Sequence, residues 1–235
     1  MSTMGAAVVI GGGSGIGAAI ARRQRDAGAE VVVWDIAGDR DVTCDITDAG
    51  QIDAATRATL DEVGVPRRVS VSAGIGHSGL LADVDGSDWD HVMGVNAKGV
   101  WLAMRALAAP MVDAGGGSIV AISSVSARLV DRSMGLYCAS KAALDMVVRV
   151  AAAEWAPTVR VNAIAPGVTD TPMLGRAPRQ GDWLTGVARR TALGRLGTPD
   201  DIAEAVVALH DLAWVTGQIV ECDGGLALRS PITPI

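Results

Sequence analysis

The sequence predicts an α/β fold, a single domain built on a doubly wound parallel sheet with helices on both faces. Short apolar runs alternate with longer segments of helical periodicity, which is the pattern of repeated β-α-β units. Apolar residues make up 49% of the 235 residues, yet the chain has no Phe and one Tyr, so Ala, Val, Ile and Leu must fill the core. Parallel sheets covered on both faces have this character.

The predicted elements follow one another in the order that this fold requires. Strands are expected at 6–10, 30–34, 69–72, 118–122, 159–163 and 218–220, and helices at about 15–27, 48–63, 87–113, 135–156 and 199–212. The connection from Asp35 to the short run Asp41–Cys44 is too short for a crossover helix, so we expect a loop with an abbreviated strand. Segment 172–195 is rich in Gly, Pro and Arg without periodicity, and we expect a long substrate loop with a short helix.

Composition and charge disfavour several classes of partner. Acidic residues outnumber basic ones 26 to 20, which gives a net charge of -6 and argues against nucleic acid. No run of about 18 uncharged apolar residues exists, so no membrane partner is expected. The first residues lack the pattern of a secretory signal, and Cys44, Cys138 and Cys222 are too scattered for a disulfide framework or a metal cage. We therefore expect a cytoplasmic protein without a metal.

A glycine-rich segment follows the first predicted strand. It reads Gly11-Gly12-Gly13-Ser14-Gly15-Ile16-Gly17, and helical periodicity begins at once after it. Glycines let the backbone approach a pyrophosphate, and the next helix offers free N–H groups, as in Rossmann-type dinucleotide sites. Asp35 ends the second strand, where a carboxylate can accept hydrogen bonds from an adenosine ribose. A plain glycine-rich turn and a solvated acid are the alternatives, but the two features together favour a dinucleotide site.

The only tyrosine of the chain lies four residues before a lysine. On a helix, Tyr137 and Lys141 share a face, so the ammonium lies within electrostatic reach of the phenol. Lowering the phenol pKa from about 10 to about 7 requires about 4 kcal/mol, which a buried lysine beside a cationic nicotinamide ring can supply. Ser124 ends the fifth strand and can polarise a carbonyl. The alternative is an amphipathic surface pair, because Tyr-x-x-x-Lys is common by chance.

Further motifs follow in order along nearly the whole chain. They are Asp45-Ile46, Ser72-Ala73-Gly74, Asn96-Ala97-Lys98-Gly99, Pro166-Gly167-Val168-Thr169-Asp170-Thr171, Arg195-Leu196-Gly197-Thr198-Pro199-Asp200-Asp201 and Asp223-Gly224-Gly225. Together with the glycine-rich segment, Ser124 and the Tyr137/Lys141 pair, this order resembles the classical short-chain dehydrogenase/reductase family.

The resemblance implies a catalytic set of Asn96, Ser124, Tyr137 and Lys141. By analogy with the family, Tyr137 would exchange a proton with the substrate oxygen while hydride passes to or from the nicotinamide, and Ser124 would orient that oxygen. Lys141 would hold the nicotinamide ribose and lower the phenol pKa. Asn96 would keep a water in the proton path through its helix carbonyl. A solvent-facing polar residue inside a helix is the alternative for Asn96.

The resemblance also implies which residues contact the cofactor. Asp35 would bind the ribose, Asp45 would receive the adenine amino group, and Ile46 would lie against the ring. The other implied contacts are Gly11, Ser14, Gly15, Ile16, Gly17, Ser72, Ala73, Gly74, Tyr137, Lys141, Pro166, Gly167, Val168 and Thr171, with the segment from Pro166 to Thr171 clasping the carboxamide. NAD is the expected cofactor, because a carboxylate at Asp35 repels the 2′-phosphate of NADP. Ile36 follows Asp35, and Arg40 is the only nearby basic residue, which we expect to be solvated.

Two positions depart from the family pattern. The family usually has Thr where this chain has Ile10, and Asn-Asn-Ala-Gly where it has Val71-Ser72-Ala73-Gly74. Both sites lie on neighbouring strands, so we interpret the changes as apolar replacement of a structural polar link, with the local geometry at Ser72 left open. His77 is expected to be a surface loop residue, although it can face the site.

The expected activity is NAD-dependent oxidation and reduction between a secondary alcohol, hydroxysteroid-like or alicyclic, and its ketone. The alternatives are a 3-oxoacyl thioester reductase of the same family and a non-catalytic NAD-binding protein. In segment 172–195, the arginines 176, 179, 189 and 190 are expected to be solvated rather than to bind an acidic substrate, and Trp183 can cover an apolar one. Helices apolar on more than one face, at 87–113 and 135–156, together with the family resemblance predict a homotetramer.

Overall fold

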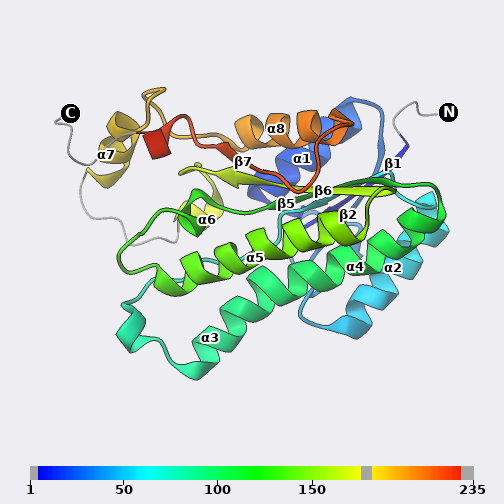
Figure 1. Cartoon of the computed structure of the whole chain (residues 1–235), viewed down its shortest axis with the longest axis horizontal. Coiled ribbons are helices and arrows are strands. Elements are labelled where there is room, and N and C mark those ends of the chain that lie inside the picture. The colour runs from blue at the N-terminus through cyan, green and yellow to red at the C-terminus, as the bar shows by residue number, and fades with distance from the viewer. Residues whose placement is uncertain (1–4, 176–181, 229–235) are drawn as a thin grey trace.

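The computed structural model describes residues 5–175 and 182–228, and it contains a sheet of seven parallel strands (Figure 1). The strands are β1 Ala6–Ile10, β2 Glu30–Asp35, β3 Val42–Thr43, β4 Arg68–Val71, β5 Gly117–Ile122, β6 Val159–Pro166 and β7 Ile219–Cys222. Their spatial order is β3-β2-β1-β4-β5-β6-β7, so the winding reverses between β1 and β4. Ligands of open parallel sheets bind at such a reversal, outside the carboxyl ends of the strands. The predicted fold class is confirmed.

Two layers of helices cover the sheet. Figure 1 shows α1 and α8 on one side of it and α2, α4 and α5 on the other. Their bounds are α1 Gly15–Asp26, α2 Ala49–Val63, α4 Val100–Asp113, α5 Gly135–Glu154 and α8 Pro199–Asp211. The alternation of side chains along β1 sends Val9 into the cluster under α1 and α8, and Val8 and Ile10 into the cluster under α4 and α5. All five residues of β1 are buried, which explains their continuous apolar run.

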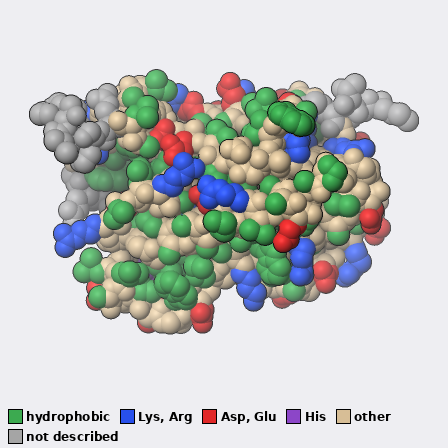
Figure 2. Space-filling view, viewed as in Figure 1, with side chains coloured by type: hydrophobic (Ala, Val, Ile, Leu, Met, Phe, Trp, Pro, Cys, Tyr) green, Lys and Arg blue, Asp and Glu red, His purple; other side chains and the backbone are tan. Residues whose placement is uncertain are grey.

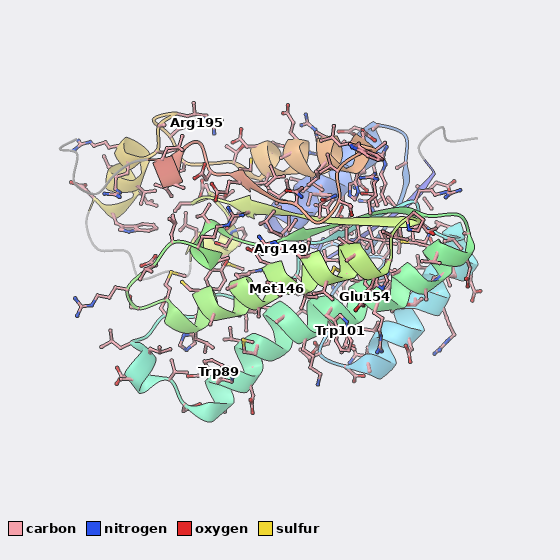
Figure 3. All side chains as sticks on the ribbon, in the orientation of Figure 1. Trp89, Trp101, Met146, Arg149, Glu154 and Arg195 are labelled. Carbon is pink, nitrogen blue, oxygen red and sulfur yellow. The ribbon has the colours of Figure 1, made fainter. Side chains whose placement is uncertain are left out.

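Local signals explain where the helices begin. The Asp48 side chain accepts hydrogen bonds from the backbone of Gly50 and Gln51 at the start of α2. At the start of α8, Thr198 and Asp201 form a reciprocal capping box, and Pro199 occupies the first turn. Arg195, labelled in Figure 3, holds the Asp201 carboxylate through two hydrogen bonds of 2.6 and 2.7 Å.

The segment predicted as one helix over 87–113 is continuous but not uniform. It consists of α3 Gly86–Met93, the π-helical segment η2 Gly94–Gly99 and α4. At Gly99, a Cβ atom would lie 2.9 Å from both the backbone oxygen and Cγ1 of Ile46, so only glycine permits this close packing. π-Helical turns often occur at functional sites, and this one carries Asn96.

Of the two connections predicted to be irregular, the β2–β3 loop agrees with the prediction and segment 172–195 differs from it. The β2–β3 connection is a loop without a helix, as predicted, and it folds back onto the glycine-rich segment, because a Cβ on Gly38 would lie 2.3 Å from the Gly13 oxygen. The expectation of a loop with one short helix at 172–195 is corrected, because the described part contains two helices, α6 Pro172–Gly175 and α7 Trp183–Arg190. Residues 176–181, including Arg176 and Arg179, lie outside the described residues.

Short 3-10 turns are found at η1 Leu81–Asp83, η3 Val125–Ala127 and η4 Leu226–Leu228. Over residues 5–175 and 182–228, no helix has the length and apolar character needed to cross a membrane. The same residues bring together no group of three His, Cys, Asp or Glu side chains that could hold a metal ion.

Candidate active site

The glycine-rich segment forms a cradle at the point where the winding of the sheet reverses. Gly11 has φ +74°, and a Cβ there would lie 2.4 Å from the backbone nitrogen of Ala73. A Cβ on Gly17 would lie 2.0 Å from the Gly11 oxygen, so neither position tolerates a side chain. Ser14 precedes α1 but makes no side-chain cap, which leaves the first N–H groups of the helix to another acceptor. A pyrophosphate fits this combination of a tight backbone and an uncapped helix start.

Asp35 lies at the carboxyl end of β2 and faces the glycine-rich segment. Its two carboxylate oxygens accept hydrogen bonds from Gly13 N at 2.8 Å and Ala37 N at 3.1 Å. An ionised carboxylate has about four acceptor positions, so these bonds leave capacity for two ribose hydroxyls. The guanidinium of Arg40 is bonded to the Gly38 oxygen and the Thr43 hydroxyl, both at 2.9 Å.

The departures at Ile10 and Ser72 meet at the junction of β1 and β4. Ile10 and Val71 are register partners, and both side chains lie in the same buried cluster. The backbone nitrogens of Ser72 and Ala73 donate to the Ile10 oxygen at 2.7 and 3.2 Å. Apolar packing and backbone hydrogen bonds therefore join the two strand ends, in agreement with a structural replacement at this point.

Asp45 and Ile46 follow β3. The Asp45 carboxylate accepts hydrogen bonds from the nitrogen and the hydroxyl of Thr47, at 2.9 and 2.8 Å. The side chain of Ile46 is only 5% exposed and belongs to the buried cluster, where it packs against Gly99. Ile46 therefore packs inside the core and supports the π-helical segment. Its contact with an adenine ring stays a prediction.

The segment from Pro166 to Thr171 leaves the end of β6 and crosses to the glycine-rich segment. It is held by hydrogen bonds from Gly167 N to the Cys222 oxygen at 3.1 Å and from Gly197 N to the Val168 oxygen at 3.0 Å. A Cβ on Gly15 would lie 3.7 Å from Cβ of Thr171, so these two segments face each other. The predicted contact residues from both therefore lie together.

Asn96 is buried, with 0% of its surface exposed, so the alternative of a solvent-facing residue is wrong. Its side chain accepts from Ile75 N at 2.8 Å and donates to the Ile75 oxygen at 2.9 Å and to Ser140 Oγ at 3.0 Å. Ser140 Oγ in turn donates to the backbone carbonyl oxygen of Tyr137 at 2.7 Å. Asn96 thus ties the strand β4 side of the site to α5.

Tyr137, Lys141 and Ser124 lie together at the carboxyl ends of the strands. Lys141 Nζ donates to the Ile122 oxygen at 2.9 Å and lies 5.9 Å from the centre of the Tyr137 ring. A Cβ on Gly74 would lie 3.3 Å from Lys141 Nζ and 3.2 Å from Asn96 Oδ1, so Gly74 leaves room for both. The interpretation of Tyr137 and Lys141 as a surface pair is wrong, because Lys141 is only 4% exposed.

Burial dominates the charge states of this group. Burial raises the pKa of Tyr137 above its ordinary value of 10, and the hydrogen bond with Ser124 opposes the rise. Burial lowers the pKa of Lys141 to about 8, and the Asp145 carboxylate opposes that fall. The chain's own groups thus raise the phenol pKa, and the fall expected beside a cationic nicotinamide stays a prediction.

Two residues of the site were missed in the sequence. Ser140 bridges the Asn96 side chain and the backbone oxygen of Tyr137, and its place directly before Lys141 was a signal. Asp145 is 4% exposed and accepts a hydrogen bond from Ser123 Oγ at 2.5 Å. Its spacing of four residues from Lys141, on an apolar helix face, was the signal for Asp145.

The remaining candidates lie at the margin of the site. The side chain of His77 is 15% exposed, and its Nε2 lies 3.5 Å from an Asp88 oxygen, so the expected surface position of His77 is corrected to a mostly buried one. Trp183 is 40% exposed. Arg189 and Arg190 are exposed at the end of α7, in agreement with solvated side chains.

Comparisons with known proteins agree with this geometry. A family model described as Enoyl-(Acyl carrier protein) reductase matches residues 11–227. The chain is 35% identical over 241 residues to 2-(S)-hydroxypropyl-CoM dehydrogenase 3 of Xanthobacter autotrophicus, covering 93% of this chain and 94% of the relative. It is 37% identical over 239 residues to galactitol 2-dehydrogenase (L-tagatose-forming) of Cereibacter sphaeroides, covering 93% of each. The ligand-free aldohexose dehydrogenase of Thermoplasma acidophilum superposes with a TM-score of 0.91 at 29% identity, covering 98% of this chain and 97% of the other.

These matches span almost the whole chain and include dehydrogenases of known fold. The chain belongs to the classical short-chain dehydrogenase/reductase family, as its motifs indicated. It is an oxidoreductase that interconverts an alcohol and a ketone.

Proposed function

We propose that the chain is an NAD-dependent oxidoreductase in which Tyr137 exchanges the proton with a secondary alcohol or its ketone. The observation that carries this proposal is that Tyr137, Lys141 and Asn96 converge at the carboxyl ends of the strands, on the same edge as the glycine cradle and Asp35. The nicotinamide cofactor, when bound, supplies the hydride acceptor or donor.

The chain's own residues divide the remaining work. Ser124 orients the substrate oxygen, and its hydrogen bond favours the ionised phenol of Tyr137. Lys141 holds the nicotinamide ribose and adds positive charge beside the phenol. The Asn96 side chain fixes the π-helical segment against Ile75 and Ser140. The main-chain carbonyl of Asn96 accepts a hydrogen bond from a water in the proton path.

The cofactor is held by the predicted contact residues along the switch point. The uncapped start of α1 receives the pyrophosphate, Asp35 the adenosine ribose, Asp45 the adenine amino group, and the segment from Pro166 to Thr171 the carboxamide. NAD is favoured over NADP because Asp35 repels a 2′-phosphate. Arg40 does not offset this repulsion, since its guanidinium is bonded to Gly38 and Thr43.

An apolar or alicyclic secondary alcohol is the proposed substrate, and segment 172–195 is its proposed cover. Exposed apolar side chains flank the site: Leu81 packs beside Gly135 at the start of α5, and Met173 lies 3.9 Å from the Cβ position of Gly76. The second candidate is a 3-oxoacyl thioester. The description of the matching family model, Enoyl-(Acyl carrier protein) reductase, names another acyl thioester and supports only this broader class of substrate.

A panel of substrates assayed with NAD and NADP in parallel tests this function. The panel contains alicyclic alcohols, hydroxysteroids, sugar alcohols, a 2-hydroxyalkyl thioether and 3-oxoacyl thioesters, with absorbance at 340 nm as the readout. NAD-dependent turnover of a secondary alcohol supports the proposal, and turnover of 3-oxoacyl thioesters alone supports the second candidate. Binding of NAD without turnover of any member would favour a non-catalytic NAD-binding protein.

The assembly that we propose is a homotetramer formed through the solvent-facing sides of α3, α4 and α5. Figure 2 shows hydrophobic side chains gathered over the region of α3 and α5, and Figure 3 shows Trp89, Trp101 and Met146 on the helices of this face. These three side chains are 43, 37 and 56% exposed. A helix that is apolar on two faces needs a second partner, and a second copy of this chain provides one.

The scattered free cysteines support the cytoplasm as the compartment, which cell fractionation tests.

A further inference from the structure

A cavity of about 330 Å³ lies at the amino ends of β4, β5 and β6, at the end of the sheet opposite the glycine cradle. Its walls include Arg67, Arg68, Ser118, Arg160 and His210, and none of its described lining residues is acidic. Sites for small molecules begin at about 300 Å³, so this cavity suits a small ligand and not a dinucleotide.

The register of the sheet places three of these residues in one row. Arg68 is the partner of Ser118, and Ser118 is the partner of Arg160. Side chains in register on parallel strands point to the same face, and neighbouring strands lie about 4.8 Å apart. The two arginines therefore flank the serine on the face covered by α8.

Buried polar atoms in the cavity wall lack a hydrogen-bond partner among residues 5–175 and 182–228. They are Ser118 Oγ and His210 Nδ1, in side chains that are 2 and 4% exposed. Gln24 donates to Ser70 Oγ at 3.3 Å, and Ser70 Oγ lies 3.0 Å from His210 Nε2. With the Ser70 proton directed at Nε2, the imidazole proton lies on Nδ1, so the His210 atom without a partner is a donor. Buried polar groups are normally satisfied by protein, water or a ligand, so both atoms are available to a ligand in the cavity.

Positive charge exceeds negative charge around this wall. Arg160 donates to the backbone oxygens of His210 and Val215, and Arg67 donates to that of Gly116, so neither has a carboxylate among these partners. Arg68 pairs with Asp211 at 2.7 Å. Burial, together with Arg68 and Arg160, lowers the pKa of His210 to about 3, so the imidazole is neutral and adds no charge. Planar guanidiniums match the geometry of phosphate and carboxylate groups.

We propose that this cavity is a binding site for a small oxyanion, held between Arg68, Ser118 and Arg160. The shared chemistry is a phosphate or carboxylate group that accepts hydrogen bonds from the two guanidiniums, the Ser118 hydroxyl and His210. Arg160 also holds the last turn of α8 through the His210 oxygen, so a bound anion fastens this helix end to the sheet. The six residues from Arg160 to Pro166 put the site about 20 Å from the carboxyl ends of the strands.

Calorimetric titration of the full chain tests this site. Inorganic phosphate, methyl phosphate and succinate are titrated separately, with ionic strength held constant by KCl, to distinguish free phosphate, a phosphate ester and a carboxylate. We expect saturable binding of at least one of these anions at one site. Affinity should fall at least tenfold in Arg160→Met and severalfold in Ser118→Ala, in line with the loss of charge-assisted and neutral hydrogen bonds.

The matched control is Arg57→Met, which removes an exposed arginine on α2 and leaves the net charge equal to that of Arg160→Met. Its affinity should stay within twofold of the original chain. Ser118→Ala decides the question if Arg160→Met does not fold. Binding absent above the KCl background, or equal affinity in Ser118→Ala, Arg160→Met and Arg57→Met, would overturn the proposal, because the anion would then bind elsewhere or not at all.

Discussion

Lys141 and Asp145 lie one turn apart on the buried face of α5, and both side chains contact the end of β5. Lys141 donates to the Ile122 oxygen at 2.9 Å, and Asp145 accepts from the Ser123 hydroxyl at 2.5 Å. Asp145 raises the pKa of Lys141 against the burial that lowers it to about 8. The carboxylate thus helps to keep the lysine charged near neutral pH.

Asp145→Asn should shift the pH dependence of catalysis. The amide can still accept the Ser123 hydrogen bond but carries no charge, so the pKa of Lys141 falls further. The pH at which kcat/KM declines on the alkaline side is expected to fall by about one unit, which is the size of effect that a nearby opposite charge produces. Asp61→Asn, at an exposed position of α2, serves as the control. An alkaline limb at the same pH in both variants would contradict the role of Asp145.

Cofactor preference should depend on Asp35. We expect kcat/KM to favour NAD over NADP by at least about 10², equivalent to about 2.7 kcal/mol. Asp35→Ala should narrow the ratio chiefly by weakening NAD, since it removes the acceptor of the ribose hydroxyls. Asp35→Asn keeps an oxygen for the Gly13 N–H and so separates the loss of charge from the loss of the loop contact. Equal or better efficiency with NADP in the original chain would show that Asp35 does not face the ribose.

Sedimentation velocity at micromolar concentration tests the assembly. A tetramer is expected for the original chain, and Met146→Glu should produce smaller species because it buries a charge in the proposed interface. Ala58→Glu, on the exposed side of α2, should leave the tetramer intact. A 24.0 kDa species for the original chain would exclude this assembly.

Stability in mild acid should depend on His210. Its pKa in the folded chain is lowered from 6.5 to about 3 by burial and by Arg68 and Arg160, so the unfolded chain binds the proton first. The neutral His210 therefore contributes its full share of the free energy of unfolding above pH 6.5. As the pH falls from 6.5 toward 3, this share decreases by about 1.4 kcal/mol per pH unit. Asp201, whose pKa is lowered, loses its contribution only below 3.8.

Urea unfolding at pH 7.5, 6.0 and 5.0 measures this slope. His210→Gln should unfold with a free energy that falls less steeply between pH 6.0 and 5.0 than that of the original chain. Identical slopes in the two proteins would show that His210 takes up its proton in the folded chain.

The sequence was sufficient to predict the strands, the main helices and the glycine cradle, because each depends on local periodicity or on glycine at close approaches. The ends of α1 and α2 lie within one residue of their expected positions. The π-helical turn that buries Asn96 was not predicted, since it depends on the packing of Ile46 against Gly99, which are distant in sequence. One short helix was expected in segment 172–195 without a stated position, and the structure has two there, α6 and α7, because helices of four and eight residues span too few turns for the sequence to define their number and bounds.

The residues of the site were predicted unevenly for a similar reason. Tyr137 and Lys141 stand in a recognisable motif. Asp145 has only its spacing from Lys141 as a signal, and its contact with Ser123 is visible only in the fold. Ser118 has no signal in the sequence, because its neighbours Arg68 and Arg160 come from other strands. His77 looked like a loop residue, and only the fold brings it against Asp88.

The most direct measurement is the initial rate of absorbance change at 340 nm for Tyr137→Phe, relative to the original chain, at saturating NAD and the best substrate of the panel. The ring of Tyr137 still packs in the variant, so cofactor affinity should stay within a few-fold while the ionisable oxygen is lost. We expect the rate to fall at least about 10²-fold, the usual contribution of a general acid or base. A rate above about a tenth of the original would contradict proton exchange by Tyr137.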